Sequence, residues 1–215
     1  MKSQTTIAIA KIAIAGVITY NVILTVLIFI KSDLDPYWHT ISEYAFGSFG
    51  WLMTVAFLCS ALAYASILVA IKSEIKGVVG HVGLAILFIC AVATIGVGLF
   101  KTDPLTTPQN QISTPGMIHM ISGGAALFLL PFAAMLINLS LAFRNKNWQS
   151  SRKLVLFTAG VPMLGLAGFI AHYVIHVAPL GENAYGPGVP IGYPPRALFL
   201  TYMIWLITLA IQTQK

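Results

Sequence analysis

Charged residues are scarce in this sequence. Asp, Glu, Lys and Arg together make up 8% of the 215 residues, against about 25% in soluble globular domains. That scarcity excludes an ordinary soluble protein. Intrinsic disorder is excluded as well, because a chain that is 58% apolar has ample surface to bury.

Cysteine is rarer still. Cys59 and Cys90 are the only two, and both lie inside apolar runs, so they are interpreted as small packing residues and a disulfide-rich scaffold is excluded. The chain also lacks the glycine repeat of collagen and the charged heptads of a coiled coil. Its mean hydropathy of +0.86 leaves a helical membrane protein as the remaining class.

Six apolar stretches are long enough to cross a bilayer. A spanning helix needs about 20 mostly apolar residues, and it satisfies its own backbone hydrogen bonds in lipid. The sequence therefore predicts an all-α, polytopic membrane protein: one domain over residues 1–215, built as a six-transmembrane-helix bundle. The predicted spans are residues 7–30, 50–71, 78–100, 116–143, 154–177 and 196–211.

Basic residues are divided unequally between the two ends of these spans. Nine of the twelve Lys and Arg residues fall on the side of both termini. Because Lys and Arg favour cytoplasmic loops, we expect cytoplasmic N and C termini in a multi-pass protein of the plasma membrane. The net charge of +6 is then explained by this topology and by attraction of the basic residues to anionic lipid headgroups, so membrane lipids are the expected partners. The charge gives no support to a nucleic-acid partner. The nine residues are Lys2, Lys11, Lys72, Lys76, Arg144, Lys146, Arg152, Lys153 and Lys215.

Polar residues gather near the opposite, outer ends of the predicted spans. Asp35-Pro36 is a helix-start signal, and Gly47 can end that helix, so residues 36–46 are predicted to lie along the membrane interface as a helix. On such a helix His39 and Glu43 share a face. The candidate catalytic residues on this side are His39, Ser42, Glu43 and Asp103.

Three more outer residues are candidates for binding a ligand. Arg196 opens the sixth span, where it could bind a lipid phosphate or pair with an acid. Tyr44 and Trp51 belong to an aromatic group at the same interface. The Gly- and Pro-rich segment of residues 178–195 has no apolar period, which favours a cap over this side. Trp148, on the terminal side, is expected to be an interfacial anchor.

A metal site is the sharpest prediction from residue spacing. His172 and His176 lie four residues apart on one helix, a spacing that can chelate one metal ion. His119, at the outer end of the fourth span, is the candidate third ligand, and zinc is the cofactor that this set suits. The alternative is that each ring reaches the lipid headgroups and has no further role.

Four short motifs resemble a known family. Ser42-Glu43-Tyr44-Ala45, Gly50-Trp51-Leu52-Met53, Phe100 with Asp103, and Gly116-Met117-Ile118-His119 are similar to the bacterial membrane family catalogued as domain of unknown function 998. The resemblance implies a six-helix fold and a bacterial inner membrane, and it singles out Ser42, Glu43, Asp103 and His119. It implies no reaction. Lys101 and Thr102 depart from the pattern, in which a Pro directly follows the Phe.

A second similarity is a chemical analogy. Alkaline ceramidases and adiponectin-receptor-like hydrolases hold zinc with three histidines, beside an Asp and a Ser, and the analogy gives those roles to His119, His172, His176, Asp103 and Ser42. Those proteins have seven helices, and this chain has no Ser-x-x-x-His.

The sequence leaves several functions open. One is a metal-dependent hydrolase in which zinc activates water and Asp103 or Glu43 moves the proton, acting on a lipid or small amphiphile. Another is a proton-coupled transporter or ligand-binding protein without metal. Haem ligation and a structural role with partner subunits in a membrane complex also remain.

Overall fold

The computed structural model describes residues 2–215, except the side chains of residues 182 and 183. It confirms the all-α fold class, and the described residues contain no strand. Six helices are long and apolar enough to cross a membrane. They are α1 (Gln4–Ile30), α2 (Gly50–Ile71), α3 (Gly77–Leu99), α4 (Thr114–Arg144), α5 (Arg152–His172) and α6 (Tyr193–Thr213).

Five short helical turns connect these helices. A 3-10 helix η1 (Ile41–Ala45) precedes α2, and η2 (Gln109–Gln111) precedes α4. On the other side, η3 (Lys146–Ser151) joins α4 to α5. A π-helical turn η4 (Tyr173–Val177) prolongs α5 and leads into η5 (Ala178–Asn183).

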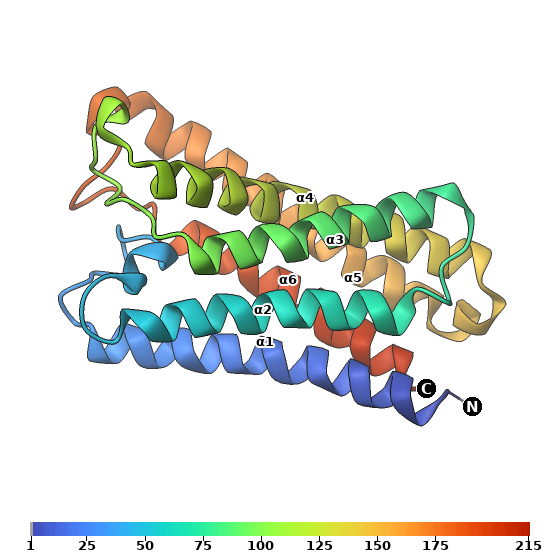
Figure 1. Cartoon of the computed structure of the whole chain (residues 1–215). Helices are drawn as coiled ribbons and strands as arrows, with labels where there is room; N and C mark the ends of the chain where they lie inside the picture. The colour runs from blue at the N-terminus through green and yellow to red at the C-terminus, as the bar shows by residue number, and fades with distance from the viewer. Residues whose placement is uncertain (1) are drawn as a thin grey trace.

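The six helices are arranged as a ring in sequence order (Figure 1). Each packs on its neighbour along the chain, and α6 closes the ring by packing on α1. Both termini lie at one end of the bundle, which we call the terminal end, together with the α2–α3 and α4–α5 connections. The three longer connections lie at the opposite end, which we call the loop end.

The helices are apolar on nearly every side, as membrane helices are. Phe29, Val78 and Leu164 are 75% or more exposed on the outside of the bundle, where lipid would cover them. Small residues bring the helices together on the inside. A Cβ on Gly83 of α3 would stand 2.9 Å from the backbone nitrogen of Ile137 in α4, so only glycine permits this approach.

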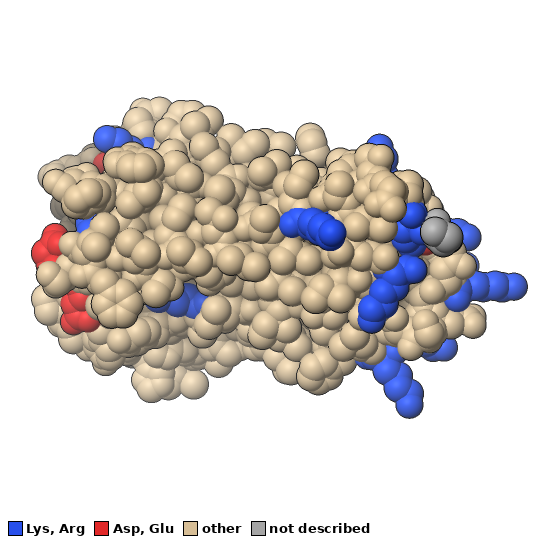
Figure 2. Space-filling model, turned by 90° about the horizontal axis from the view of Figure 1, so that it is seen from below, with Lys and Arg blue, Asp and Glu red and all other residues tan. Residues whose placement is uncertain are grey.

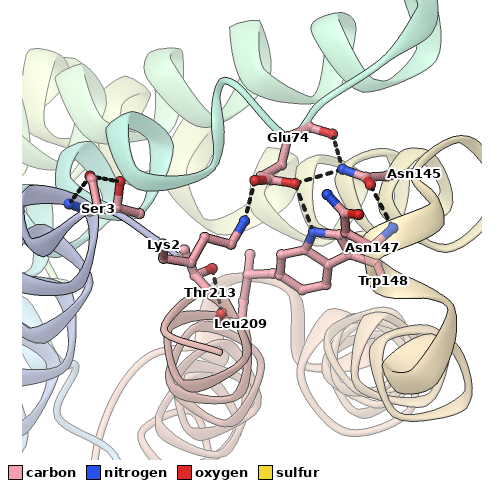
Figure 3. A network of polar contacts seen from close by, with 9 residues as sticks. Lys2, Ser3, Glu74, Asn145, Asn147, Trp148, Leu209 and Thr213 are labelled. Atoms are coloured by element: carbon pink, nitrogen blue, oxygen red, sulfur yellow. Dashed lines mark hydrogen bonds and ion pairs between the residues drawn. The ribbon is translucent and has the colours of Figure 1, made fainter.

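A partly buried polar cluster ties three segments together at the terminal end (Figure 3). Glu74, between α2 and α3, forms an ion pair with Lys2. Its Oε2 accepts hydrogen bonds from Asn145 Nδ2 at 2.7 Å and Trp148 Nε1 at 3.3 Å. The expectation that Trp148 anchors at the interface is therefore wrong: its side chain is 4% exposed, because its N–H is directed inward to Glu74.

The two ends of the bundle differ in charge. Figure 2 shows most of the visible Lys and Arg side chains at the terminal end and the visible Asp and Glu side chains at the loop end. Glu74 is the only acid among the six that belongs to the terminal end.

Candidate functional site

The predicted interfacial helix over residues 36–46 is wrong. Asp35 closes a turn instead, because its Oδ1 accepts the Tyr37 N–H at 2.9 Å and its carbonyl accepts the His39 N–H at 3.0 Å. Only residues 41–45 are helical. His39 and Glu43 therefore do not share a helical face, and the His39 ring contacts the Asp35 carbonyl and the Trp38 ring.

Glu43 is a buried carboxylate that holds the backbone around it. Its side chain is 4% exposed. Oε2 accepts the Thr40 N–H at 2.8 Å and the Thr40 hydroxyl at 3.2 Å, and Oε1 accepts the Leu105 N–H at 3.2 Å. Glu43 thereby joins η1 to the connection between α3 and α4, and these donors occupy both of its oxygens.

Ser42, the neighbour of Glu43, is paired with a histidine from another part of the chain. Ser42 Oγ lies 2.8 Å from Nε2 of His119 on α4. The other ring nitrogen, Nδ1, lies 2.8 Å from the carbonyl oxygen of Phe100, at the end of α3. His119 is 6% exposed, and the ring of Phe57 meets it edge-on with centroids 6.3 Å apart.

The partners of His119 determine its tautomer. A carbonyl oxygen only accepts hydrogen bonds, so Nδ1 carries a proton and donates to Phe100. In the neutral ring Nε2 is then the acceptor, and the Ser42 hydroxyl donates to it. The sequence singles out both residues, but it predicts a catalytic role for Ser42 and the role of a metal ligand for His119. Nothing in the sequence pairs residues 77 positions apart, since that contact depends on how α3 and α4 pack against η1.

Asp103 lies beside the start of α4. Its Oδ2 accepts the Ser113 N–H at 2.7 Å. A Cβ on Gly116 would stand 2.0 Å from that oxygen, so a larger residue there would displace the Asp103 carboxylate. The negative charge also favours the N-terminus of α4 electrostatically. The described contacts of Asp103 thus fix the first turn of α4, one turn before His119.

A cavity of about 270 Å³ lies at the loop end, inside the ring of helices. Its walls are mainly aliphatic and aromatic, with a few hydroxyls and one imidazole among them. Ser42 stands on this wall, and so does Tyr20, whose buried hydroxyl has no hydrogen-bond partner among the described residues. The cavity is lined by Tyr20, Thr40, Ile41, Ser42, Phe57, Ser60, Tyr64, Thr94, Val97, Leu105, Gly123, Ala126, Leu127, Phe169, His172, Tyr173, Val177, Tyr185, Ile191, Pro194, Pro195 and Phe199.

The segment after α5 forms one wall of this cavity. Val177, Tyr185 and Ile191 face it. His172 fastens the segment from α5 by donating from Nε2 to the Pro190 carbonyl at 2.7 Å. The Gly192 N–H donates to the Tyr37 carbonyl at 2.9 Å and fastens its other end. The segment predicted to be a cap thus contributes to the cavity.

The three histidines proposed for zinc do not form a metal site. The rings of His172 and His176 lie 4.9 Å apart, in line with their spacing. His172 Nε2 is engaged by Pro190, and both nitrogens of His119 are engaged by Ser42 and Phe100. Within residues 2–215 as described, no group of three or more His, Cys, Asp or Glu side chains could hold a metal ion.

Arg196 and Tyr44 support the loops rather than the cavity. Arg196 donates from one terminal nitrogen to the carbonyls of Pro36, His39 and Gly192, at 3.2, 3.0 and 2.6 Å. The sequence offers a lipid phosphate or an acid as the partner of Arg196, whereas its described hydrogen bonds go to these three carbonyls, two in the turn before η1 and one at the start of α6. Tyr44 lies under Arg196, fully buried, and its hydroxyl donates to the Leu34 carbonyl.

A second hollow, of about 310 Å³, has His119 on its wall. Trp51 and Lys101 are exposed on its rim. Phe57 and Val97 line both spaces and separate them. Of the residues predicted to bind a ligand, Trp51 alone lines either space.

Comparison with known proteins agrees with the motifs described above. No curated protein and no solved structure matches the chain. A family model described as Protein of unknown function (DUF998) matches residues 13–212, nearly the whole chain, including all six helices in whole or in large part. The chain therefore belongs to this family.

Proposed function

We propose that this multi-pass protein binds one amphiphile, a lipid or a smaller molecule, whose apolar part enters the cavity at the loop end. The observation that carries the proposal is a mainly apolar cavity at the loop end, with a few hydroxyls and one imidazole among its lining residues. Ligand pockets are typically apolar with a few placed polar groups.

The volume of the cavity limits what it can hold. An engineered cavity of about 150 Å³ holds benzene, and pockets for drug-sized ligands begin at about 300 Å³. A space of about 270 Å³ suits one medium-length acyl chain and is too small for the two chains of a phospholipid. The polar head of such a ligand would lie toward the loops.

We place the loop end on the non-cytoplasmic side of the plasma membrane. The nine Lys and Arg residues at the terminal end favour the cytoplasm. The alternative of a proton-coupled transporter would need His39, Glu43, Asp103 and Arg196 around one space. None of these four residues lines the cavity, so binding of an apolar group has the better support.

Two adjacent glycines of α4 provide a matched test. Gly123 lines the cavity, and a Cβ there would meet only Val97, at 3.9 Å. Gly124 does not line the cavity, and a Cβ there would meet nothing within 4 Å. Gly123→Leu should fill the cavity, whereas Gly124→Leu adds the same side chain elsewhere on the helix.

The experiment uses the purified protein in lipid nanodiscs and dodecanoic acid carrying a photoactivatable diazirine. We expect cross-links to residues of the cavity wall, mapped by mass spectrometry. Gly123→Leu should reduce them about tenfold, since overpacking opposes binding by about 1–3 kcal/mol, and Gly124→Leu should not. Cross-links confined to lipid-facing residues, or equal cross-linking in both variants, would refute the proposal.

A further inference from the structure

We propose that Ser42 and His119 are a nucleophile and its general base, which act on an acyl ester held in the cavity. The inference rests on the proposed function, because the cavity must bind the acyl chain for Ser42 to meet it. It adds a reaction that needs no metal ion, and it gives His119 a role different from zinc ligation.

The geometry of the pair is that of an activated serine. Serine is a weak nucleophile unless a base within hydrogen-bond distance removes its proton, and the base is in turn oriented by a third group. Ser42 Oγ and His119 Nε2 are 2.8 Å apart, and the Phe100 carbonyl orients the ring from Nδ1 at the same distance. The third group is a backbone carbonyl in place of the usual carboxylate.

The surroundings keep this arrangement fixed. Phe57 packs edge-on against the His119 ring, and Glu43 holds the turn that carries Ser42 through Thr40 and Leu105. Glu43 is therefore a positioning residue, which joins the backbone just before Ser42, at Thr40, to the α3–α4 connection at Leu105. Preorganisation of this kind is what an active site needs, because a catalytic group must be held close to its productive geometry.

The position of Ser42 also selects the substrate. Ser42 lines the apolar cavity at the loop end of the bundle. An acyl chain in the cavity would bring its ester group to that wall. The second hollow, with His119 on its wall and Lys101 on its rim, gives water and the leaving alcohol a route to the base.

The reaction balances with water as the only co-reactant. Ser42 Oγ bonds to the ester carbonyl carbon while its proton passes to His119 Nε2. The bond from that carbon to the alcohol oxygen then breaks, and His119 returns the proton to the leaving alcohol. Water attacks the acyl-serine and gives a proton to His119, which passes it to Ser42 Oγ as the carboxylic acid departs.

An alkyl fluorophosphonate tests the nucleophile directly, because its phosphorus bonds to an activated serine oxygen and fluoride leaves. We expect labelling of the wild-type protein at Ser42. Ser42→Ala should abolish it, and His119→Gln should slow it at least about 100-fold, the lower range for general base catalysis. Ser48→Ala removes an exposed serine in the same connection and is the control that should label normally. Hydrolysis of p-nitrophenyl dodecanoate should change in parallel.

The photoactivatable dodecanoic acid separates the two proposals and serves as a test of folding. Ser42→Ala should still cross-link in the cavity. If the wild-type protein cross-links there but Ser42 is not labelled, or another serine is labelled instead, the catalytic inference is overturned and the binding proposal stands. If neither reagent reacts in the cavity, both proposals fail.

Discussion

At the scale of single residues, Glu43 shows how a carboxylate can serve a site without facing the ligand. Its two carboxylate oxygens accept hydrogen bonds from three donors, one of which lies 62 residues away in the chain. Carboxylates that accept several backbone N–H groups are strong local supports. Its neighbour Ser42 owes its position to this support.

Glu43→Ala should therefore lower both stability and reactivity. The part-buried N–H groups of Thr40 and Leu105 would lose their acceptor, at a loss of about 1–3 kcal/mol in the free energy of unfolding. Thermal unfolding in detergent measures this loss, and fluorophosphonate labelling measures the displacement of Ser42. Asp33→Ala, at an exposed position on the same end, is the control. Glu43→Ala with wild-type stability would contradict the assignment.

The residues of the candidate site could be named from the sequence, but their relations could not. The resemblance of the short motifs pointed to Ser42, Glu43, Asp103 and His119. The spacing of His172 and His176 correctly places their rings together, yet spacing along one helix says nothing of a third ligand. The bond between Ser42 and His119 joins η1 to α4, and it depends on packing that no local pattern encodes.

At the scale of elements, hydropathy was sufficient to predict the long helices but not the structure of the loops. Lipid imposes a helix on any long apolar stretch, so six helices follow directly from the sequence. Residues 36–46 carry the same start signal that a helix would have, but the Asp35 side chain bonds to Tyr37 and closes a turn. Competition of this kind between side chain and backbone decides loop structure.

Glu74 joins the start of α1, the α2–α3 turn and the α4–α5 connection, and it should make stability depend on pH. Burial alone would raise its pKa, but the donors Lys2, Asn145 and Trp148 outweigh burial and hold the pKa below its ordinary value. A lowered folded pKa means that the contribution of Glu74 is fully present above the unfolded value. It is lost as the pH falls through the folded value.

Glu74→Gln should consequently lower the melting temperature at pH 7, and the difference from the wild type should shrink as the pH falls below about 4. Melting curves in detergent between pH 3 and pH 7 measure this convergence. Asp33→Asn, at an exposed position of the loop end, should follow the wild type throughout. A difference that stays constant over the whole range would mean that charge at Glu74 is unimportant.

At the scale of the whole molecule, the closed ring of helices separates two chemically different ends. The terminal end carries most of the basic charge, and the loop end carries the cavity, Ser42 and His119. The sequence predicted this separation, because the order of the spans assigns each loop to one side. It did not predict the cavity, whose walls come from all six helices and from the three connections of the loop end.

The orientation has a direct test. A green fluorescent protein fused after Lys215 should fluoresce, and alkaline phosphatase fused at the same place should be inactive, because both would be cytoplasmic. Fusions at Thr107, in the α3–α4 connection at the loop end, should give the reverse pattern. Active phosphatase at Lys215 would show that the bundle has the opposite orientation, with the candidate site on the cytoplasmic side.

The Glu74 cluster also constrains how the chain is assembled. Its carboxylate belongs to the turn after the second helix, whereas Asn145 and Trp148 follow the fourth. During synthesis, α1 and α2 are therefore made before Asn145 and Trp148. Until then, Lys2 is the one partner of the Glu74 cluster that is available to the Glu74 carboxylate. We therefore expect the α2–α3 turn to gain its full set of hydrogen bonds only after the α4–α5 connection has been synthesised.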